Sequence, residues 1–318
     1  MKGIVMGLVS IAVLALGGVA AIPATTPKGV TEGNARVALG VYDPHREFAG
    51  ESDVDIEHIF VYWQALDVQD LKSRLAYARK RDRAMIVTVE PYTKAANWRD
   101  GGERLFGDIT AGRFDKQIDT VCGAMGDFGG RLLVRWGHEM EDATGRYPWA
   151  RKDSEGYKSA YRYFVDACRR HVPDAAFVWS PKGEKNLARY YPGDAHVDYV
   201  GLAVWGLQAM DRDYFGGRRD FRQTFREKYD RVAGFGKPVL IAELGVSGDA
   251  AYRRDWFGSL YDTVSRRGEF RLLQGVVYFN DKEPHQWPLG YGAPDWRIKN
   301  GWFANARRVS TAVAQKTP

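Results

Sequence analysis

Two glutamates that end short apolar runs are the residues of this chain best placed to do chemistry together. The run from Leu132 to Val134 leads into a polar cluster that holds Arg135, His138 and Glu139. A second apolar run, much later in the chain, ends in Glu243. A buried strand that surfaces at its carboxyl end and carries one carboxylate into a pocket has this pattern. Two such strands predict a site with two carboxylates.

Two carboxylates on opposite sides of a glycosidic bond suffice to hydrolyse it. One protonates the leaving oxygen and the other attacks the anomeric carbon; separations of about 5–5.5 Å give retention, whereas wider ones admit a water and give inversion. The acid must stay protonated, which a neighbouring negative charge favours. Arg135, four residues before Glu139, is expected on the same side of the strand, where it bonds the nucleophile or neutralises the cluster. Each glutamate taken singly could instead belong to a buried ion pair.

The elements that must position these side chains alternate between apolar runs and helical patterns. We expect strands at 37–42, 59–63, 85–89, 132–134, 176–179, 197–205, 238–243 and 275–279, and helices at 68–81, 114–126, 154–171, 220–233, 250–266 and 302–314. This order predicts an α/β fold, a single (β/α)8 TIM barrel with long βα loops. A doubly wound open sheet is the rival, but it would normally carry a Gly-rich phosphate turn after an early strand, and the sequence has none.

Barrel enzymes place their chemistry at the carboxyl ends of their strands. The side chains at these ends are Asp43, Glu90, Glu139, Trp205, Glu243 and Asn280. A long Gly-rich connection, Thr93 to Gly112, is expected to form part of a functional surface. Aromatic side chains in or near such connections are candidates for stacking on sugar rings, although packing beneath loops is an equal alternative. They are Tyr92, Trp98, Tyr147, Trp149, Trp205 and Trp287.

Composition narrows the function classes. The 318 residues are 45% hydrophobic and 27% charged, which is ordinary for a globular protein. The net charge of +6 is spread along the chain without a block of like charge, which favours a solvated surface over nucleic-acid binding. No His or Cys pair has the spacing of metal ligands, so we expect neither a metal nor a cofactor.

The N-terminal region differs from the rest. Lys2 is followed by an apolar run from Gly3 to Ile22, which predicts a signal peptide cleaved after Ala20 or Ala21. An uncleaved N-terminal anchor over residues 1–21 is the alternative, and only that alternative would bring the protein to a membrane. Residues 22–35 are expected to be a linker. Either reading predicts a secreted or periplasmic protein.

The two cysteines, Cys122 and Cys168, are the only ones in the chain. Each falls in an expected amphipathic helix, where a buried free thiol fits. An exported protein could also join them in a disulfide. The helical positions favour free thiols.

Several segments together resemble glycoside hydrolase family 26. The stretch Arg135-Trp-Gly-His-Glu-Met140 resembles the acid/base strand of that family, and Ile241-Ala-Glu-Leu-Gly245 resembles its nucleophile strand. Segments 109–115, 177–181, 190–194 and 197–201 are also similar, so the resemblance covers most of residues 36 to 305. Its most specific element is the His-Glu pair, because related barrel glycosidases usually have Asn before the acid/base glutamate.

The resemblance implies a retaining β-glycanase. We expect an endo-acting monomer whose catalytic domain spans residues 36–318. The resemblance also implies that Glu139 is the acid/base and Glu243 the nucleophile, and that His138 and Arg135 position the nucleophile and the substrate. Family substrates are β-1,4-mannan, mixed-linkage β-1,3-1,4-glucan and β-1,3-xylan. The alternative is a weakly catalytic or non-catalytic carbohydrate-binding accessory protein of polysaccharide synthesis or export.

The chain departs from the family pattern at three places. After His-Glu-Met, mannanases usually continue Asn-Gly, whereas this chain reads Glu141 to Trp149 without that pair. Trp205 stands where a nucleophile-bonding Tyr is expected, and an indole donates one hydrogen bond but accepts none. Lys182 stands where Asn is common. These changes leave the two glutamates intact and leave mannan and β-glucan as competing substrates.

Overall fold

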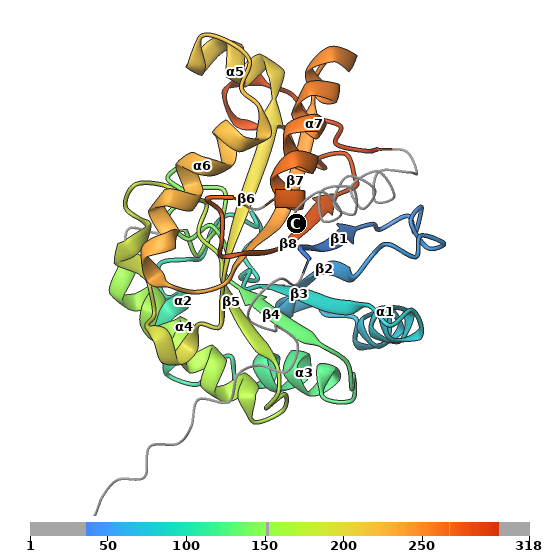
Figure 1. Cartoon of the computed structure of the whole chain (residues 1–318). Helices are drawn as coiled ribbons and strands as arrows, with labels where there is room; N and C mark the ends of the chain where they lie inside the picture. Colours follow the sequence, from blue (N-terminus) through green and yellow to red (C-terminus); the bar gives the residue numbers. More distant parts are fainter. Residues whose placement is uncertain (1–35, 151–152, 267, 299–318) are drawn as a thin grey trace, which may run out of the picture. The chain divides into compact units, whose positions relative to one another are not determined.

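The eight expected strands form a closed barrel (Figure 1) in the computed structural model, which describes residues 36–150, 153–266 and 268–298. Neighbouring strands are parallel and follow the order of the chain, and β8 pairs with β1 to close the barrel. The strands are β1 (Ala38–Tyr42), β2 (Ile56–Tyr62), β3 (Ala84–Glu90), β4 (Leu132–Trp136), β5 (Ala176–Trp179), β6 (Tyr199–Leu207), β7 (Val239–Ser247) and β8 (Leu273–Phe279). The predicted (β/α)8 barrel is therefore confirmed.

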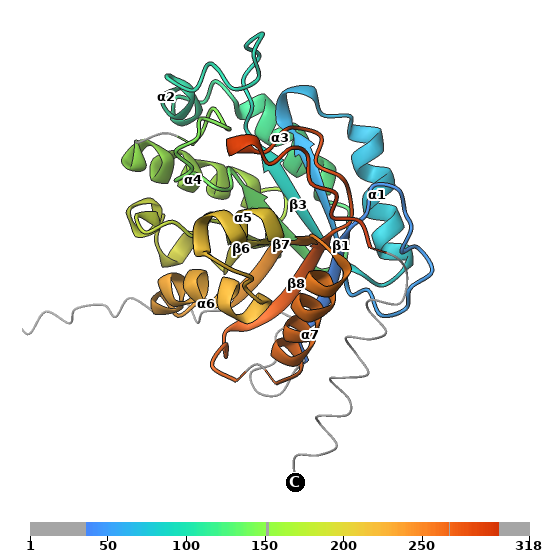
Figure 2. The same cartoon turned by 90° about the horizontal axis from the view of Figure 1, so that it is seen from above.

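Helices cover the outside of the barrel, as the view from above shows (Figure 2). They are α1 (Val68–Lys80), α2 (Leu105–Thr110), α3 (Asp115–Met125), α4 (Ser154–Arg169), α5 (Gln208–Phe215), α6 (Phe221–Val232) and α7 (Ala250–Arg266). The expected helix at 302–314 and the N-terminal segment lie outside the described residues.

Local sequence explains both kinds of element. All seven residues of β3 are buried, since one face of each strand meets the barrel interior and the other meets the helices, and this is why the strands appear as apolar runs. In α1 the buried residues Leu71, Leu75 and Ala78 recur at helical spacing. Asp67 caps this helix by accepting hydrogen bonds from the backbone N–H groups of Gln69 and Asp70.

The structure differs from the expected elements in ways that affect the site. The connection from Thr93 to Gly112 is not wholly irregular, because α2 lies within it. Helix α5 follows β6 directly and was not expected. Strand β7 continues to Ser247, so Glu243 lies inside this strand and not at its end. Strand β4 ends at Trp136, before Glu139 is reached.

A disulfide joins Cys122 of α3 to Cys168 of α4. The favoured prediction of two free thiols was therefore wrong. Both residues are fully buried and their Cα atoms lie 5.3 Å apart, within the range that a disulfide spans. Helical periodicity places each cysteine toward the interior, but it cannot show that the two helices are neighbours.

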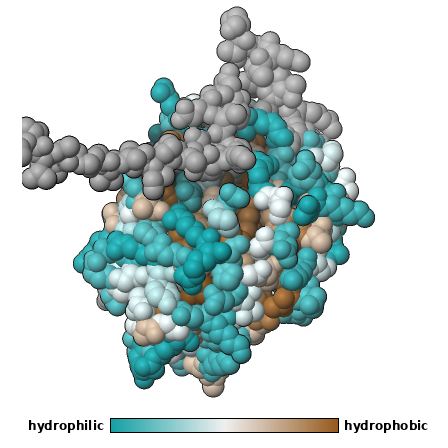
Figure 3. All heavy atoms as spheres, turned by 90° about the horizontal axis from the view of Figure 1, so that it is seen from below, coloured by the Kyte–Doolittle hydropathy of each residue, from teal (hydrophilic) through white to brown (hydrophobic). Residues whose placement is uncertain are grey.

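The surface has few large apolar side chains. Within the described ranges, those exposed are Tyr62, Tyr214, Phe215 and Leu289. The face seen from below is mostly hydrophilic where it is coloured (Figure 3). In the part of the chain with described coordinates, no helix is long and apolar enough to cross a membrane.

Candidate active site

Glu243 and Arg135 form a buried ion pair across the barrel interior. Arg135 is fully buried on β4, Glu243 is 8% exposed on β7, and Nη2 lies 2.7 Å from Oε1. The contact is ionic and not a directed hydrogen bond, because neither atom has a hydrogen-bond partner. Arg135 Nη1 also donates to Thr88 Oγ1 on β3 at 3.3 Å. These contacts hold the guanidinium beside the Glu243 carboxylate.

Glu139 lies in a strained turn just after β4. Its φ is 52°, a left-handed value that is uncommon outside glycine, and Gly137 has a φ of 53°. The Glu139 N–H donates to the carbonyl of Ser180, which follows β5, at 2.8 Å. Because β4 ends at Trp136, the spacing of four residues from Arg135 does not place the two side chains on one strand face. The turn positions Glu139 instead.

The surroundings of Glu139 favour its protonated form. Burial raises the pKa of Glu139, and the negative charge of Glu243 raises it further. Arg146, Lys182 and Lys228 act in the opposite direction and more weakly. The structure thus brings together one carboxyl that tends to keep its proton and one carboxylate paired with an arginine.

His138 is held by the loop that follows Glu139. It is 1% exposed, its Nε2 lies 3.2 Å from the hydroxyl of Tyr147, and its carbonyl accepts a hydrogen bond from Trp149 Nε1 at 2.7 Å. Burial lowers the pKa of His138, and the charges of Arg135 and Arg146 lower it further, so the ring is neutral.

Tyr147 and Trp149 pack beneath the loop. Their rings stack with centroids 4.6 Å apart, and both are buried, Trp149 completely. Packing beneath the loop therefore describes these two side chains better than stacking on a sugar does, because protein covers the faces of their rings. What they do in the site is fix His138.

Of the other aromatic candidates, Trp98 and Trp287 line a small cavity, and Tyr92 and Trp205 contact them edge-on. Trp98 stacks on His285 with ring centroids 5.3 Å apart, and Tyr92 meets Trp98 edge-on at 5.5 Å. Trp205 of β6 meets Trp287 edge-on at 5.9 Å. The cavity has a volume of about 180 Å³ and is lined by Trp98, Arg99, Thr144, Arg146, His285, Gln286 and Trp287. Trp98 and Trp287, far apart in sequence, thus face one space.

Two charged residues of this site, Glu90 and Arg146, received no role from the sequence. Glu90 ends β3 and is 6% exposed; burial, and then the charge of Glu243, raise its pKa to about 8. Arg146 lies 3.7 Å from Glu283; burial lowers its pKa, but the combined influence of Tyr147, Glu139, Glu283 and Glu243 raises it. The position of Glu90 at a strand end was a usable signal. Nothing in the local pattern marks Arg146.

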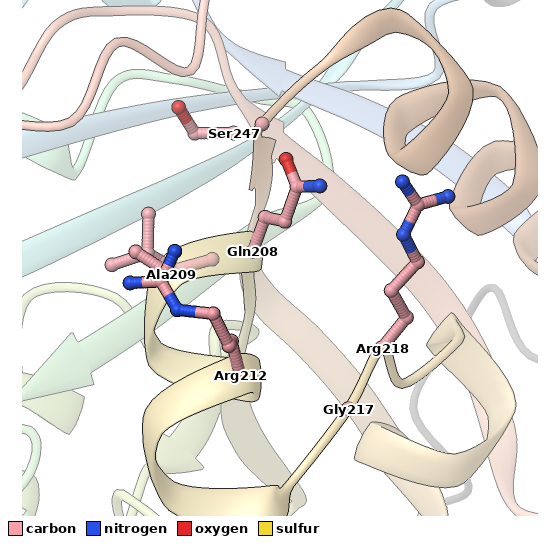
Figure 4. Close-up of a pocket in the computed structure, with 8 residues that line it drawn as sticks. Gln208, Ala209, Arg212, Gly217, Arg218 and Ser247 are labelled. Atoms are coloured by element: carbon pink, nitrogen blue, oxygen red, sulfur yellow. The ribbon is translucent and has the colours of Figure 1, made fainter.

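A larger cavity, of about 430 Å³, lies beyond the ends of β6 and β7 (Figure 4). Gln208 and Arg212 of α5 line it with Arg218 and Ser247. The catalytic candidates do not line it. Two of its polar groups are already satisfied, since Gln208 Nε2 and Arg218 Nη2 both donate to Asp249. Over the described ranges, no group of three or more His, Cys, Asp or Glu side chains is arranged to hold a metal ion.

Comparison with known proteins gives a consistent result. Residues 115–230 match the model of glycosyl hydrolase family 26. The chain is 23% identical over 250 residues to Endoglucanase H of Acetivibrio thermocellus, covering 74% of this chain and 26% of the relative. It is 21% identical over 229 residues to the β-1,3-xylanase TXYA of a Vibrio species, covering 66% and 47%. The chain thus spans less than half the length of these curated relatives.

Solved structures agree on the fold. The modular endo-β-1,4-mannanase of Cellulomonas fimi superposes with a TM-score of 0.61 at 13% identity, over 88% of this chain and 70% of that one. At this identity the likeness concerns the barrel alone.

Proposed function

We propose that the chain, whose residues 115–230 match the model of glycosyl hydrolase family 26, is a retaining endo-β-glycanase, with Glu139 as acid/base and Glu243 as nucleophile. The observation that carries the proposal is the unequal environment of the two carboxyls. Glu243 lies 2.7 Å from the guanidinium of Arg135, whereas burial and the charge of Glu243 raise the pKa of Glu139. A nucleophile must be ionised and an acid must carry a proton, so the two environments suit the two roles.

In the first step, the Glu243 carboxylate attacks the anomeric carbon while the glycosidic C–O bond breaks. Glu139 gives its proton to the leaving oxygen. The new ester carries no charge at Glu243, so one cause of the raised pKa of Glu139 disappears. Glu139, now a carboxylate, takes a proton from a water that attacks the anomeric carbon, and Glu243 is released as a carboxylate.

His138 and Arg135 act as positioning residues in this scheme. Arg135 holds the Glu243 carboxylate from the β4 side. His138 is neutral and is fixed through its own carbonyl by Trp149. Trp98 and Trp287, which line the cavity, supply apolar faces for sugar rings, and so do Tyr92 and Trp205, which contact them edge-on.

The proposed substrate is a β-linked polysaccharide, either β-1,4-mannan or a β-1,3-1,4- or β-1,4-glucan. Sequence similarity to an endoglucanase and to a mannan endo-1,4-β-mannosidase supports these two classes. β-1,3-Xylan belongs in the test because of the second relative. We also propose that the protein is secreted or periplasmic; the buried disulfide supports an oxidising compartment.

The test is reducing-sugar release from mannan, glucomannan, lichenan, carboxymethyl-cellulose and β-1,3-xylan. Glu243→Ala should abolish release, and Glu139→Ala should lower it by about 10²–10⁴-fold, the usual range for loss of a general acid. Azide, which needs no general base, should restore turnover of an aryl glycoside by Glu139→Ala. NMR of the first products should show the retained anomer.

Glu155→Gln, at the exposed start of α4, is the matched control and should release sugar at the unmutated rate. Binding of these polysaccharides without release by the unmutated protein would instead favour the accessory-protein alternative. Full activity in Glu243→Ala, or an inverted first product, would refute the assigned mechanism.

A further inference from the structure

Glu90 is a third carboxyl group at the catalytic end of the barrel that the mechanism above does not use. It is the last residue of β3, and its charge interacts with Glu243 on β7 and with Glu139 after β4. Its Oε1 lies 4.0 Å from His138 Nε2, which is too long for a hydrogen bond. Among the described residues, no hydrogen bond to the Glu90 carboxyl is found, although its side chain is 7% exposed.

The charges around Glu90 are balanced without it. Arg135 is paired with Glu243, and Arg146 is paired with Glu283. The neighbouring His138 ring is neutral. An ionised Glu90 would therefore add an uncompensated negative charge to a buried cluster, which is unfavourable.

The remaining groups that face Glu90 do not change this balance. They are Glu139, which tends to keep its proton, and the phenols Tyr42, Tyr62, Tyr92 and Tyr147. None of these adds a positive charge. A carboxyl in this setting keeps its proton, and a protonated carboxyl has one O–H to donate.

We propose that Glu90 is a substrate-binding residue that works in its protonated form, donating a hydrogen bond to a hydroxyl of the sugar bound beside Glu139 and Glu243. This inference rests on the proposed function, because it needs a sugar in that place. A sugar hydroxyl would accept the O–H that no described protein group accepts. Ionisation of Glu90 removes the donor, so binding should weaken at alkaline pH.

The experiment measures binding, so that it does not depend on hydrolysis. Titration calorimetry with mannopentaose and cellopentaose is carried out on Glu139→Gln, which keeps a neutral group at the acid position, at pH 6 and pH 9. Glu90→Ala and Glu90→Gln are then added to that parent. Glu155→Gln in the same parent is the matched control for loss of a carboxyl, because Glu155 is exposed on α4.

At pH 6, Glu90→Ala should weaken binding about tenfold, the effect of losing one hydrogen bond. Glu90→Gln, whose amide also donates, should recover most of that loss. Between pH 6 and pH 9 the parent and the Glu155→Gln control should lose affinity several-fold, and the Glu90→Gln protein should not. Near-ultraviolet circular dichroism checks that each variant is folded. If Glu90→Ala does not fold, Glu90→Gln still provides the test through its pH dependence.

Three results would overturn the inference: unchanged binding in Glu90→Ala, equal loss in Glu90→Gln and Glu90→Ala, or an unchanged pH effect in Glu90→Gln. Each leaves the proposed hydrolysis untouched. Conversely, the Glu139→Gln parent and its Glu90 variants could bind as expected while the unmutated protein releases no sugar. That outcome would refute the proposed hydrolase activity but leave Glu90 as a substrate-binding residue. A parent that binds neither oligosaccharide would overturn the inference together with its premise.

Discussion

Glu139, Glu243 and Glu90 are the same residue type at the same end of one barrel, yet their surroundings differ. Glu243 has an arginine 2.7 Å away. For Glu139 and Glu90 the largest influence is burial, which raises the pKa of each, and the charge of Glu243 adds to it. One ionised group therefore helps to keep its two neighbours protonated. Side-chain identity alone does not carry this division of states; burial of Glu139 and Glu90, and the position of Arg135 beside Glu243, do.

The raised pKa of Glu90 makes stability depend on pH. The ordinary pKa is 4.5 and the folded value is about 8, so between these values the unfolded chain loses a proton that the folded protein keeps. Stability from this group is thus complete below the ordinary pKa and falls as pH rises toward the folded value, by about 1.4 kcal/mol per pH unit. Glu90→Gln removes this dependence.

As the pH rises from 5 to 7, we expect the unfolding free energy of Glu90→Gln to increase by about 2.5 kcal/mol relative to that of the unmutated protein. Urea denaturation at the two pH values measures the difference. The exposed Glu155→Gln should show no such change. An identical difference between Glu90→Gln and the unmutated protein at both pH values would mean that Glu90 titrates normally in the folded state.

At the scale of elements, the loop after β4 is where the sequence departs from the family pattern, and the structure shows what this loop holds in place. Trp149 Nε1 in this loop donates a hydrogen bond to the carbonyl of His138 at 2.7 Å. His138 directly precedes Glu139, whose backbone is strained. Farther along the same turn, Glu141 Oε1 accepts hydrogen bonds from the backbone N–H groups of Gly183 and Glu184. The loop therefore connects the turn that holds Glu139 to Trp149 and to the segment after β5.

Trp149→Phe should lower kcat/KM about tenfold, because it removes one buried hydrogen bond that holds the turn. The ring remains, so the fold should persist. Trp256→Phe on α7 is the matched control, since the Trp256 indole is buried but donates to no partner, and its loss should leave kcat/KM unchanged. Equal kcat/KM in both variants would show that the turn is held without Trp149.

The disulfide between α3 and α4 is expected to stabilise the fold by linking two helices. It closes a loop with a sequence separation of 46 residues, for which chain entropy predicts about 4 kcal/mol of stabilisation. The double variant Cys122→Ala/Cys168→Ala should lose about that much unfolding free energy in urea. Because both cysteines lie on outer helices, kcat should not change. A loss below about 1 kcal/mol would show that the link adds little.

For the whole molecule, the barrel could be predicted because strands buried on both faces appear as apolar runs, as in β3, and because their order alternates with helices. The turn at Glu139 could not, since a left-handed φ leaves no periodic signal. Pairs such as Arg146 with Glu283, or Cys122 with Cys168, join residues far apart in sequence. A single sequence shows each residue of such a pair but not that the two are in contact.

Export is a property of the whole chain, and two separate observations support it. The run from Gly3 to Ile22 has the composition of a signal peptide, and the only two cysteines form a disulfide, a bond that persists in oxidising compartments. A cytoplasmic protein would be expected to keep both thiols reduced. The two observations therefore point to the same side of the membrane although they come from different parts of the chain.

When the full chain is expressed in a secreting bacterial host, the exported protein should begin at Ala21 or Ile22 and contain no free thiol. Intact-mass measurement and thiol titration under denaturing conditions test both points on one sample. Retention of residues 1–21 with an oxidised pair would favour the anchor alternative, because the catalytic domain would still have crossed the membrane. An intact N-terminus with two free thiols would contradict export altogether, since neither processing nor oxidation would have occurred.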